Sequence, residues 1–126
     1  MNPDLENILY ERFPQLKKFT GRPLPIDCDD GWFDLLYDLL NKLNSYNIII
    51  TQIKEKFGGL RFYYFVNEKL SDSTYIIIES LVDEAEHRSY KICEICGRFG
   101  GRQSNCGWIK TLCEECARNE GYGNGE

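Results

Sequence analysis

The sequence has few of the features that would assign it to the large classes of membrane and secreted proteins. Its longest apolar run, Phe62 to Val66, covers five residues, whereas a membrane-spanning helix needs about 20. The first ten residues are acidic and include no basic, apolar leader, so a cleaved secretion signal is not expected. We therefore expect a cytoplasmic protein with no membrane segment, in which cysteines stay reduced.

The sequence also lacks the short motifs of common enzymes. It contains no GxSxG nucleophile turn, no glycine-rich phosphate loop and no HExxH zinc-protease pair. Nucleases of the treble-clef type need a histidine that activates water and usually a further nitrogen ligand for the catalytic metal. This chain has a single histidine, His87, and it lies in a predicted helix, where we interpret it as a capping or surface residue. These absences favour a non-enzymatic protein.

The composition is that of a soluble domain with a real core. Hydrophobic residues make up 42% of the 126 residues and charged residues 28%, with a mean hydropathy of -0.45. This length suits one compact domain, or one domain with a small appended module. The net charge of -5 and the pI of about 5.0 oppose binding to nucleic acid, because attraction to phosphate is mostly Coulombic.

Four of the six cysteines have the spacing of metal ligands. Cys93 and Cys96 are separated by two residues, and so are Cys113 and Cys116. A pair with this spacing can hold one tetrahedral Zn²⁺ through a tight turn, and two pairs complete a shell of four thiolates. The sequence therefore predicts a structural zinc site with no open position for chemistry.

The segment around these cysteines predicts a zinc module over residues 91–120. A turn at the first pair, a short hairpin around 100–101 and a helix that begins at the second pair follow the order of a treble clef, which we favour over a zinc ribbon. A module of this size has too little core to fold without its metal. Cys28 and Cys106 lack partners at ligand spacing, and the acids beside Cys28 disfavour a nucleophilic thiolate.

Residues 1–90 predict an α+β core. Apolar residues at helical spacing indicate helices over about 3–13, 29–43 and 72–90. β-Branched and aromatic residues on both sides of Gly58-Gly59 indicate a hairpin. The prediction leaves open whether a further strand extends this sheet. We expect the third helix to cover the apolar face of this antiparallel hairpin. The glycine-rich tail, 121–126, is expected to be disordered.

One face of the predicted hairpin is basic and aromatic. A turn at the two glycines would place Lys56 opposite Arg61, with Lys54 and Tyr63 on the same face. Like charges across a strand pair cost free energy unless an anion lies between them. That anion is either an acid of the same chain, such as those at 27–30, or a carboxylate or phosphate of a partner, and the sequence favours neither.

Two further clusters of charge allow more than one interpretation. Arg98 and Arg102 of the zinc module are either solvent-exposed, in contact with the thiolates, or part of the surface that binds a partner. Asp27, Asp29 and Asp30 are able to hold Mg²⁺. They also precede a helix, whose free amides attract carboxylates, so we favour a capping role.

Several stretches of the chain resemble a family of small proteins found in phages and bacterial genomes. They are DGW at 30–32, KEKFGGLRFY at 54–63, the CxxCG turn at Cys93, and TLC at 111–113 with Trp108 before it. The family has no established activity. The resemblance therefore implies the biological context, phages and bacteria, and implies no mechanism. Relatives often have histidine where this chain has Cys116. The resemblance implies an accessory protein that blocks or modulates a host enzyme in a bacterial or infected cell.

Three hypotheses follow for the function. The favoured one is a non-enzymatic protein-binding module, because the chain is acidic, its metal site is closed and catalytic motifs are missing. The second is a nucleic-acid-binding zinc protein that uses the basic residues. The third is a small metal-dependent enzyme built on Asp27, Asp29 and Asp30. The sequence identifies neither the partner nor the oligomeric state.

Overall fold

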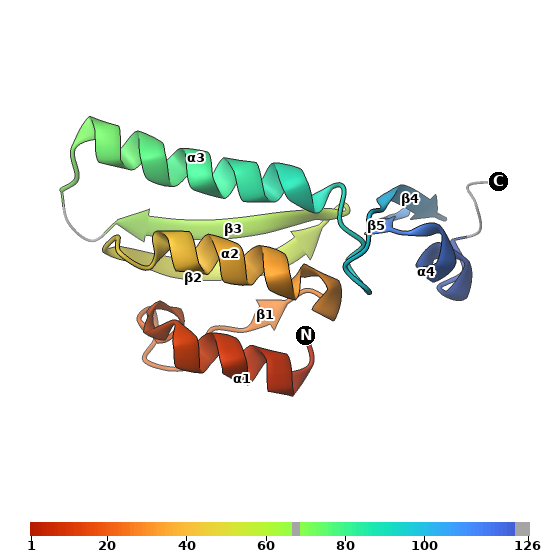
Figure 1. The fold of residues 1–126 in the computed structure, drawn as a ribbon, viewed down its shortest axis with the longest axis horizontal. Coiled ribbons are helices and arrows are strands. Elements are labelled where there is room, and N and C mark those ends of the chain that lie inside the picture. The colour runs from red at the N-terminus through yellow and green to blue at the C-terminus, as the bar shows by residue number, and fades with distance from the viewer. Residues whose placement is uncertain (67–68, 123–126) are drawn as a thin grey trace.

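The structure is a computed structural model that describes residues 1–66 and 69–122. It joins a three-stranded sheet, packed against helices, to a smaller two-stranded sheet near the C-terminus (Figure 1). The helices of the described residues are α1 Pro3–Arg12, α2 Phe33–Leu43, α3 Asp72–Ser89 and α4 Glu114–Asn119. The strands are β1 Ile26–Asp27, β2 Ile48–Lys56, β3 Gly59–Val66, β4 Gly101–Asn105 and β5 Trp108–Leu112. The predicted mixture of helix and sheet is confirmed.

Three of the four described helices begin with side-chain caps, whereas α2 does not. Asn2 caps α1 and Ser71 caps α3. A short 3-10 turn, Asp30–Trp32, precedes α2, and no side chain caps either element. The Oδ1 atom of Asp30 accepts a hydrogen bond from the backbone N of Asn2 at 2.7 Å instead. The structural role favoured for these acids therefore takes another form, because Asp30 binds the backbone of Asn2 and no acid caps the helix.

The hairpin of β2 and β3 forms as predicted, but its turn lies one residue earlier. Phe57–Gly58 is the turn, and both residues have positive φ, 54° and 85°, as in a type I′ turn. Lys54 consequently pairs with Arg61, and Lys56 pairs with Gly59. The predicted pairing of Lys56 with Arg61 is wrong, although all three cations still share one face of the sheet.

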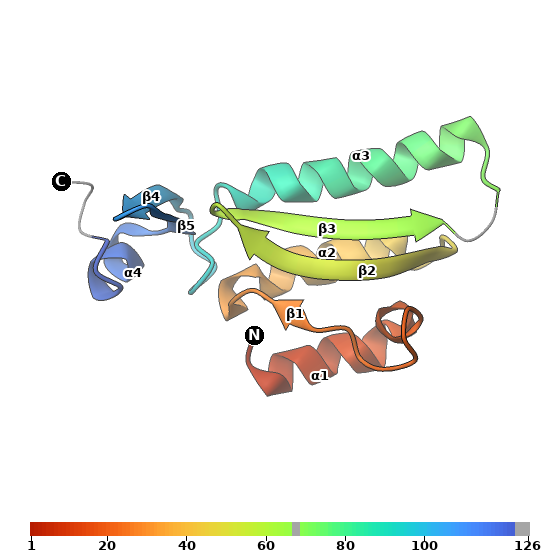
Figure 2. The same ribbon diagram turned by 180° about the vertical axis from the view of Figure 1, so that it is seen from behind.

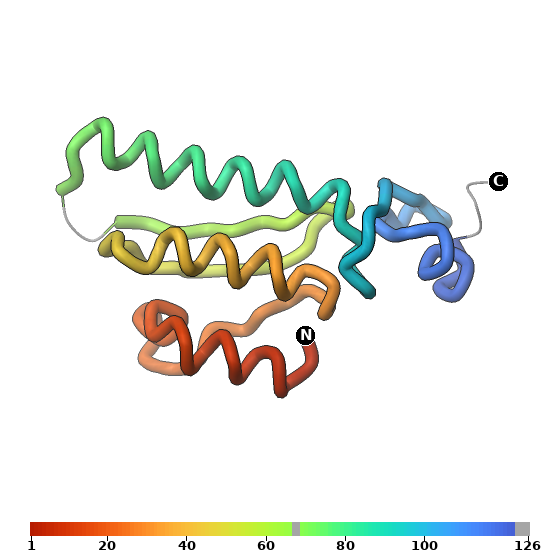
Figure 3. The backbone as a smooth tube through the Cα atoms, viewed as in Figure 1, coloured from red at the N-terminus to blue at the C-terminus, as the bar shows by residue number. Residues whose placement is uncertain are grey.

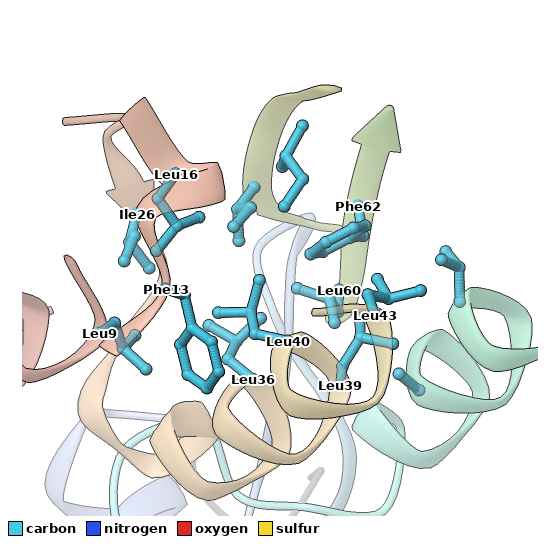
Figure 4. Packing of buried hydrophobic residues seen from close by; sticks show 14 of the residues in the cluster. Leu9, Phe13, Leu16, Ile26, Leu36, Leu39, Leu40, Leu43, Leu60 and Phe62 are labelled. Atoms are coloured by element: carbon cyan, nitrogen blue, oxygen red, sulfur yellow. The ribbon is translucent and has the colours of Figure 1, made fainter. Parts of the chain in front are cut away.

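Helices cover one face of the three-stranded sheet. β1 is the further strand, and it pairs in parallel with the middle of β2. α3 packs on β3 and α2, as expected, and the leucines of α2 meet the inward side chains of the strands (Figure 4). The opposite face of β2 and β3 has no helix over it (Figure 2). The largest buried core side chains are Trp32, Phe13, Leu9, Leu16, Leu36, Leu39, Leu40, Leu43, Ile48, Ile50, Ile53 and Leu60.

Side chains of α3 close the free edge of β3. The backbone N of Leu60 donates to Oγ of Ser89 at 2.9 Å, and the backbone N of Phe62 donates to Oε2 of Glu86 at 2.9 Å. An open strand edge is a template for a further strand. These two bonds therefore oppose strand addition at this part of β3.

The C-terminal module lies beyond one end of the core, beside the turn that joins β2 to β3 (Figure 3). At its C-terminal end, the backbone N of Tyr122 donates a hydrogen bond to the carbonyl of Ala117 at 2.7 Å. The predicted disordered tail falls mainly on residues 123–126, which lie outside the described residues. Within the described ranges, no helix is long and apolar enough to cross a membrane.

Candidate metal centre

The sulfur atoms of the four predicted ligands lie close together. The Sγ atoms of Cys93, Cys96, Cys113 and Cys116 all lie within 4.8 Å of one another, and those of Cys96 and Cys113 are 3.6 Å apart. Sulfurs bound to one tetrahedral Zn²⁺ at about 2.3 Å are about 3.8 Å from each other. The cluster therefore suits a single metal ion. It is the one group of three or more potential ligands found among residues 1–66 and 69–122.

Each cysteine pair is set by a local turn. The backbone N of Gly97 donates to the carbonyl of Cys93 at 2.9 Å, and Gly97 has a φ of 84°, which favours glycine. Cys113 is the N-cap of α4, and its Sγ accepts a bond from the backbone N of Cys116 at 3.4 Å. The two turns bring their sulfurs to the same side, as binding to one ion requires.

Arg98 contacts the cysteine cluster directly. Its Nε donates to Sγ of Cys96 at 3.4 Å, and its Nη2 lies 2.8 Å from Oε1 of Glu115. The bond from the guanidinium lowers the pKa of Cys96 to about 6. Arg98 therefore contacts a thiolate of the cluster, while its side chain remains 63% exposed to solvent.

The module has a very small core of its own. Its buried cluster consists of two of the cysteines together with Leu112 and Ala117. Two aliphatic side chains cannot offset the entropy of ordering the segment, so it depends on its contacts with the rest of the chain and on any metal ion that the cysteines hold.

One such contact joins the first cysteine turn to the DGW segment. The backbone N of Gly31 donates to the carbonyl of Glu94 at 2.7 Å, and Nε1 of Trp32 donates to the carbonyl of Ile92 at 2.9 Å. A Cβ added at Gly31 would overlap the carbonyl oxygens of Cys93 and Glu94. The glycine is thus required by the close approach of two backbones.

The side chain of Glu94 completes this contact. The residue is 1% exposed; its Oε2 accepts a bond from the backbone N of Asp29 at 3.0 Å, and its Oε1 lies 3.3 Å from Nζ of Lys110. Burial raises the pKa of the Glu94 carboxyl. Sequence reasoning missed this residue, because an acid between two cysteines has no distinctive pattern.

Replacing Glu94 tests this contact. We expect Glu94→Ala to lower the free energy of unfolding by about 2–4 kcal/mol, since it leaves the Asp29 amide and the Lys110 ammonium without their acceptor. Glu114→Ala is the control, because the ion pair that Glu114 forms within the described residues, with Arg118, is exposed. That control is expected to cost less than about 1 kcal/mol. Urea unfolding of both variants is the measurement, and equal losses would contradict the role of Glu94.

A second contact joins the module to the tip of the hairpin. Oγ1 of Thr111 donates to the carbonyl of Gly58 at 2.6 Å, and Nη2 of Arg102 donates to the carbonyl of Phe57 at 2.7 Å. The Arg102 guanidinium also lies 4.8 Å from the centre of the Tyr90 ring. Arg102 is therefore bonded within the chain, although its side chain remains on the surface.

The other predicted partner-binding residues lie on the sheet face that no helix covers. Nη1 of Arg61 donates to the Tyr90 hydroxyl at 3.1 Å. Asp27 of β1 is the neighbour of Lys54 in the sheet, although the two form no ion pair within the described residues. The residues on this face are Lys54, Lys56, Arg61 and Tyr63, of which Tyr63 is 44% exposed.

The remaining candidates stay outside the cysteine cluster. Cys28 is buried in the core, and this burial raises its pKa to about 12, which makes it a poor nucleophile. His87 is exposed in the last turn of α3, and Cys106 is exposed in the turn between β4 and β5. In the described part of the chain, Asp27, Asp29 and Asp30 do not form a group of metal ligands.

Comparisons with family models, curated proteins and solved structures found no match to this chain. The fold and the site therefore define its class by themselves. It is a protein of mixed helix and sheet with a C-terminal four-cysteine cluster that could hold a metal ion.

Proposed function

We propose that this chain is a non-enzymatic protein-binding module whose C-terminal part, residues 91–120, is stabilised by one structural Zn²⁺. The convergence of four cysteine sulfurs within 4.8 Å supports the metal. Four thiolates complete a tetrahedral shell and leave no position for water or substrate, so a zinc ion here stabilises the fold. The order of turn, hairpin and helix supports a treble-clef arrangement.

Exposed aromatic side chains support a protein partner. Phe57 and Trp108 are 56% and 75% exposed, and they lie at the hairpin tip and in the zinc module beside it. Large aromatic residues are enriched in protein interfaces and dominate their binding energy. The resemblance to phage and bacterial proteins supports the narrower proposal that the partner is a host enzyme, which this protein inhibits or modulates.

Binding to nucleic acid is the second candidate. Lys54, Lys56, Arg61 and Tyr63 on the helix-free sheet face favour it, since cations beside an aromatic ring suit a phosphate and a base. The net charge of -5 opposes it, and Asp27 lies beside Lys54. We therefore rank it below protein binding.

Capture from a host lysate, with and without nuclease, separates the two candidates. We expect the zinc-loaded protein to retain a protein partner after nuclease treatment, and the double variant Lys54→Glu, Lys56→Glu to capture at least tenfold less. The double variant Lys17→Glu, Lys18→Glu makes the same change of charge at exposed positions elsewhere and should capture normally. Capture that disappears with nuclease would establish nucleic-acid binding instead.

A further inference from the structure

A cleft lies where the hairpin tip of the core meets the hairpin of the zinc module. It has a volume of about 540 Å³, which is within the range of sites that bind small ligands and side chains. The turn of β2 and β3 contributes Phe57, and β5 contributes Trp108 and Ile109. Because each hairpin provides one wall, the cleft exists only when the zinc module is docked.

Backbone strain is concentrated at this cleft. Among the described residues, Phe57 and Cys106 are the non-glycine residues with positive φ, at 54° and 52°, and both line the cleft. A bulky residue rarely adopts this conformation, and glycine or asparagine would adopt it at lower cost. Strained residues cluster at functional sites, where the surrounding structure holds them in place.

Hydrogen bonds fix the backbone of the Phe57–Gly58 turn, while the aromatic ring of Phe57 is exposed to solvent. The carbonyls of Phe57 and Gly58 accept bonds from Arg102 and Thr111, and the backbone N of Gly58 donates to Oε2 of Glu55 at 2.8 Å. A rigid aromatic ring loses little conformational entropy when a ligand covers it. The strain at Phe57 therefore produces a preorganised apolar contact surface.

The charges of the cleft indicate what kind of ligand suits it. Lys56 lies 5.6 Å from the centre of the Phe57 ring and forms no ion pair within the described ranges. The second lysine of the lining, Lys110, is paired with Glu94, and the carboxylate of Glu55 also lines the cleft. One free cation suits one carboxylate, whereas a nucleic acid strand brings a negative charge with every nucleotide.

We propose that this cleft binds a peptide segment of a partner protein in which an apolar or aromatic side chain lies next to a carboxylate. The apolar side chain packs against Phe57 and Trp108, and the carboxylate pairs with Lys56. This inference rests on the proposed protein-binding function and specifies where the partner docks.

Synthetic peptides test the proposal directly. The probes are short fluorescein-labelled peptides with one central Trp, Phe or Leu flanked by acids, matched peptides with lysines in place of the acids, and an oligo-dT strand of similar length. Fluorescence polarisation with the zinc-loaded full chain measures the binding. We expect the acidic peptides to bind at least tenfold more tightly than the lysine peptides and oligo-dT.

Variants then locate the site. Trp108→Ala and Lys56→Glu should each weaken binding of the acidic peptide at least tenfold, whereas the controls Phe99→Ala and Lys17→Glu should leave it within twofold. Phe99 is an exposed aromatic residue of the same module, but it does not line the cleft. Phe57→Asn creates the favoured Asn-Gly turn, so it should raise the melting temperature and still weaken binding. This separates loss of contact from loss of fold.

Three results would overturn the proposal. They are acidic peptides that bind no better than lysine peptides, tighter binding of oligo-dT, and full binding by Trp108→Ala. The lysate experiment distinguishes failure of the cleft as a docking site from failure of the protein-binding function. If Trp108→Ala still captures the nuclease-resistant partner, the cleft is not the docking site, although the protein-binding function stands. If no protein is captured, the function itself is wrong.

Discussion

Replacing Cys93 or Cys113 by serine is expected to abolish metal binding and unfold the C-terminal module. Structural Zn²⁺ contributes about 10–16 kcal/mol to the folding of comparable small modules, which is far more than a core of two buried aliphatic residues supplies. Metal analysis should give one zinc per wild-type chain and none for either variant. Limited proteolysis should cut the variants within residues 91–120 and leave the core helices intact.

A cysteine outside the cluster provides the matched control for this experiment. Cys106 is exposed in the same module and lies outside the ligand cluster. Cys106→Ser should therefore bind one zinc and resist proteolysis like the wild type. A Cys93→Ser, Cys113→Ser double variant that is free of metal and still resists proteolysis would refute the structural role of zinc.

Gly31→Ala is expected to undock the zinc module from the core. The added Cβ would overlap the carbonyl oxygens of Cys93 and Glu94, and both of these atoms belong to backbone that cannot rotate away. Overpacking of this kind costs about 1–3 kcal/mol, and more where backbone must move. The neighbouring bond from Trp32 to Ile92 would also lengthen. We expect a loss of at least about 3 kcal/mol, measured by urea unfolding.

A second glycine provides a control for the effect of the Gly31→Ala substitution. Gly101→Ala is the control, because a Cβ at Gly101 would meet nothing within 4 Å and its φ is not positive. We expect that variant to change stability by less than about 0.5 kcal/mol. Hydrogen exchange of the Gly31 amide, which bonds to the Glu94 carbonyl, reports docking independently. Similar stability of the two variants would show that the close approach at Gly31 does not hold the module.

The sequence was sufficient to predict the main helices, the hairpin of the core and the cysteine cluster. Helical spacing of leucines located α2, and the two cysteine pairs identified the cluster, because both signals are local and repeat at a fixed interval. The contacts between the module and the core were not predictable in this way. They depend on single residues such as Glu94 and Gly31, whose partners lie about sixty residues away in the sequence.

The hairpin register shows why a local pattern can mislead. Gly58-Gly59 resembles a two-residue turn, but the turn uses Phe57 and Gly58. Gly59 is needed for another reason, because a Cβ at this position would overlap the ring of Tyr90. A glycine in the sequence indicates that the position requires glycine. It does not indicate whether the cause is a turn or the close approach of another group. The shift moved Lys56 away from Arg61 and placed Phe57 at the tip.

The contact between the DGW segment and the first cysteine turn also sets an order of events during synthesis. A ribosome makes residues 29–32 long before it makes residues 92–94, so the amide of Gly31 and the indole of Trp32 have no partners while the sheet assembles. If the cysteine cluster holds a structural metal ion, the nascent core has one end open until the cysteines emerge and bind that ion. With zinc as that ion, zinc supply in the cell would govern when the whole chain becomes native, as well as how stable it is afterwards.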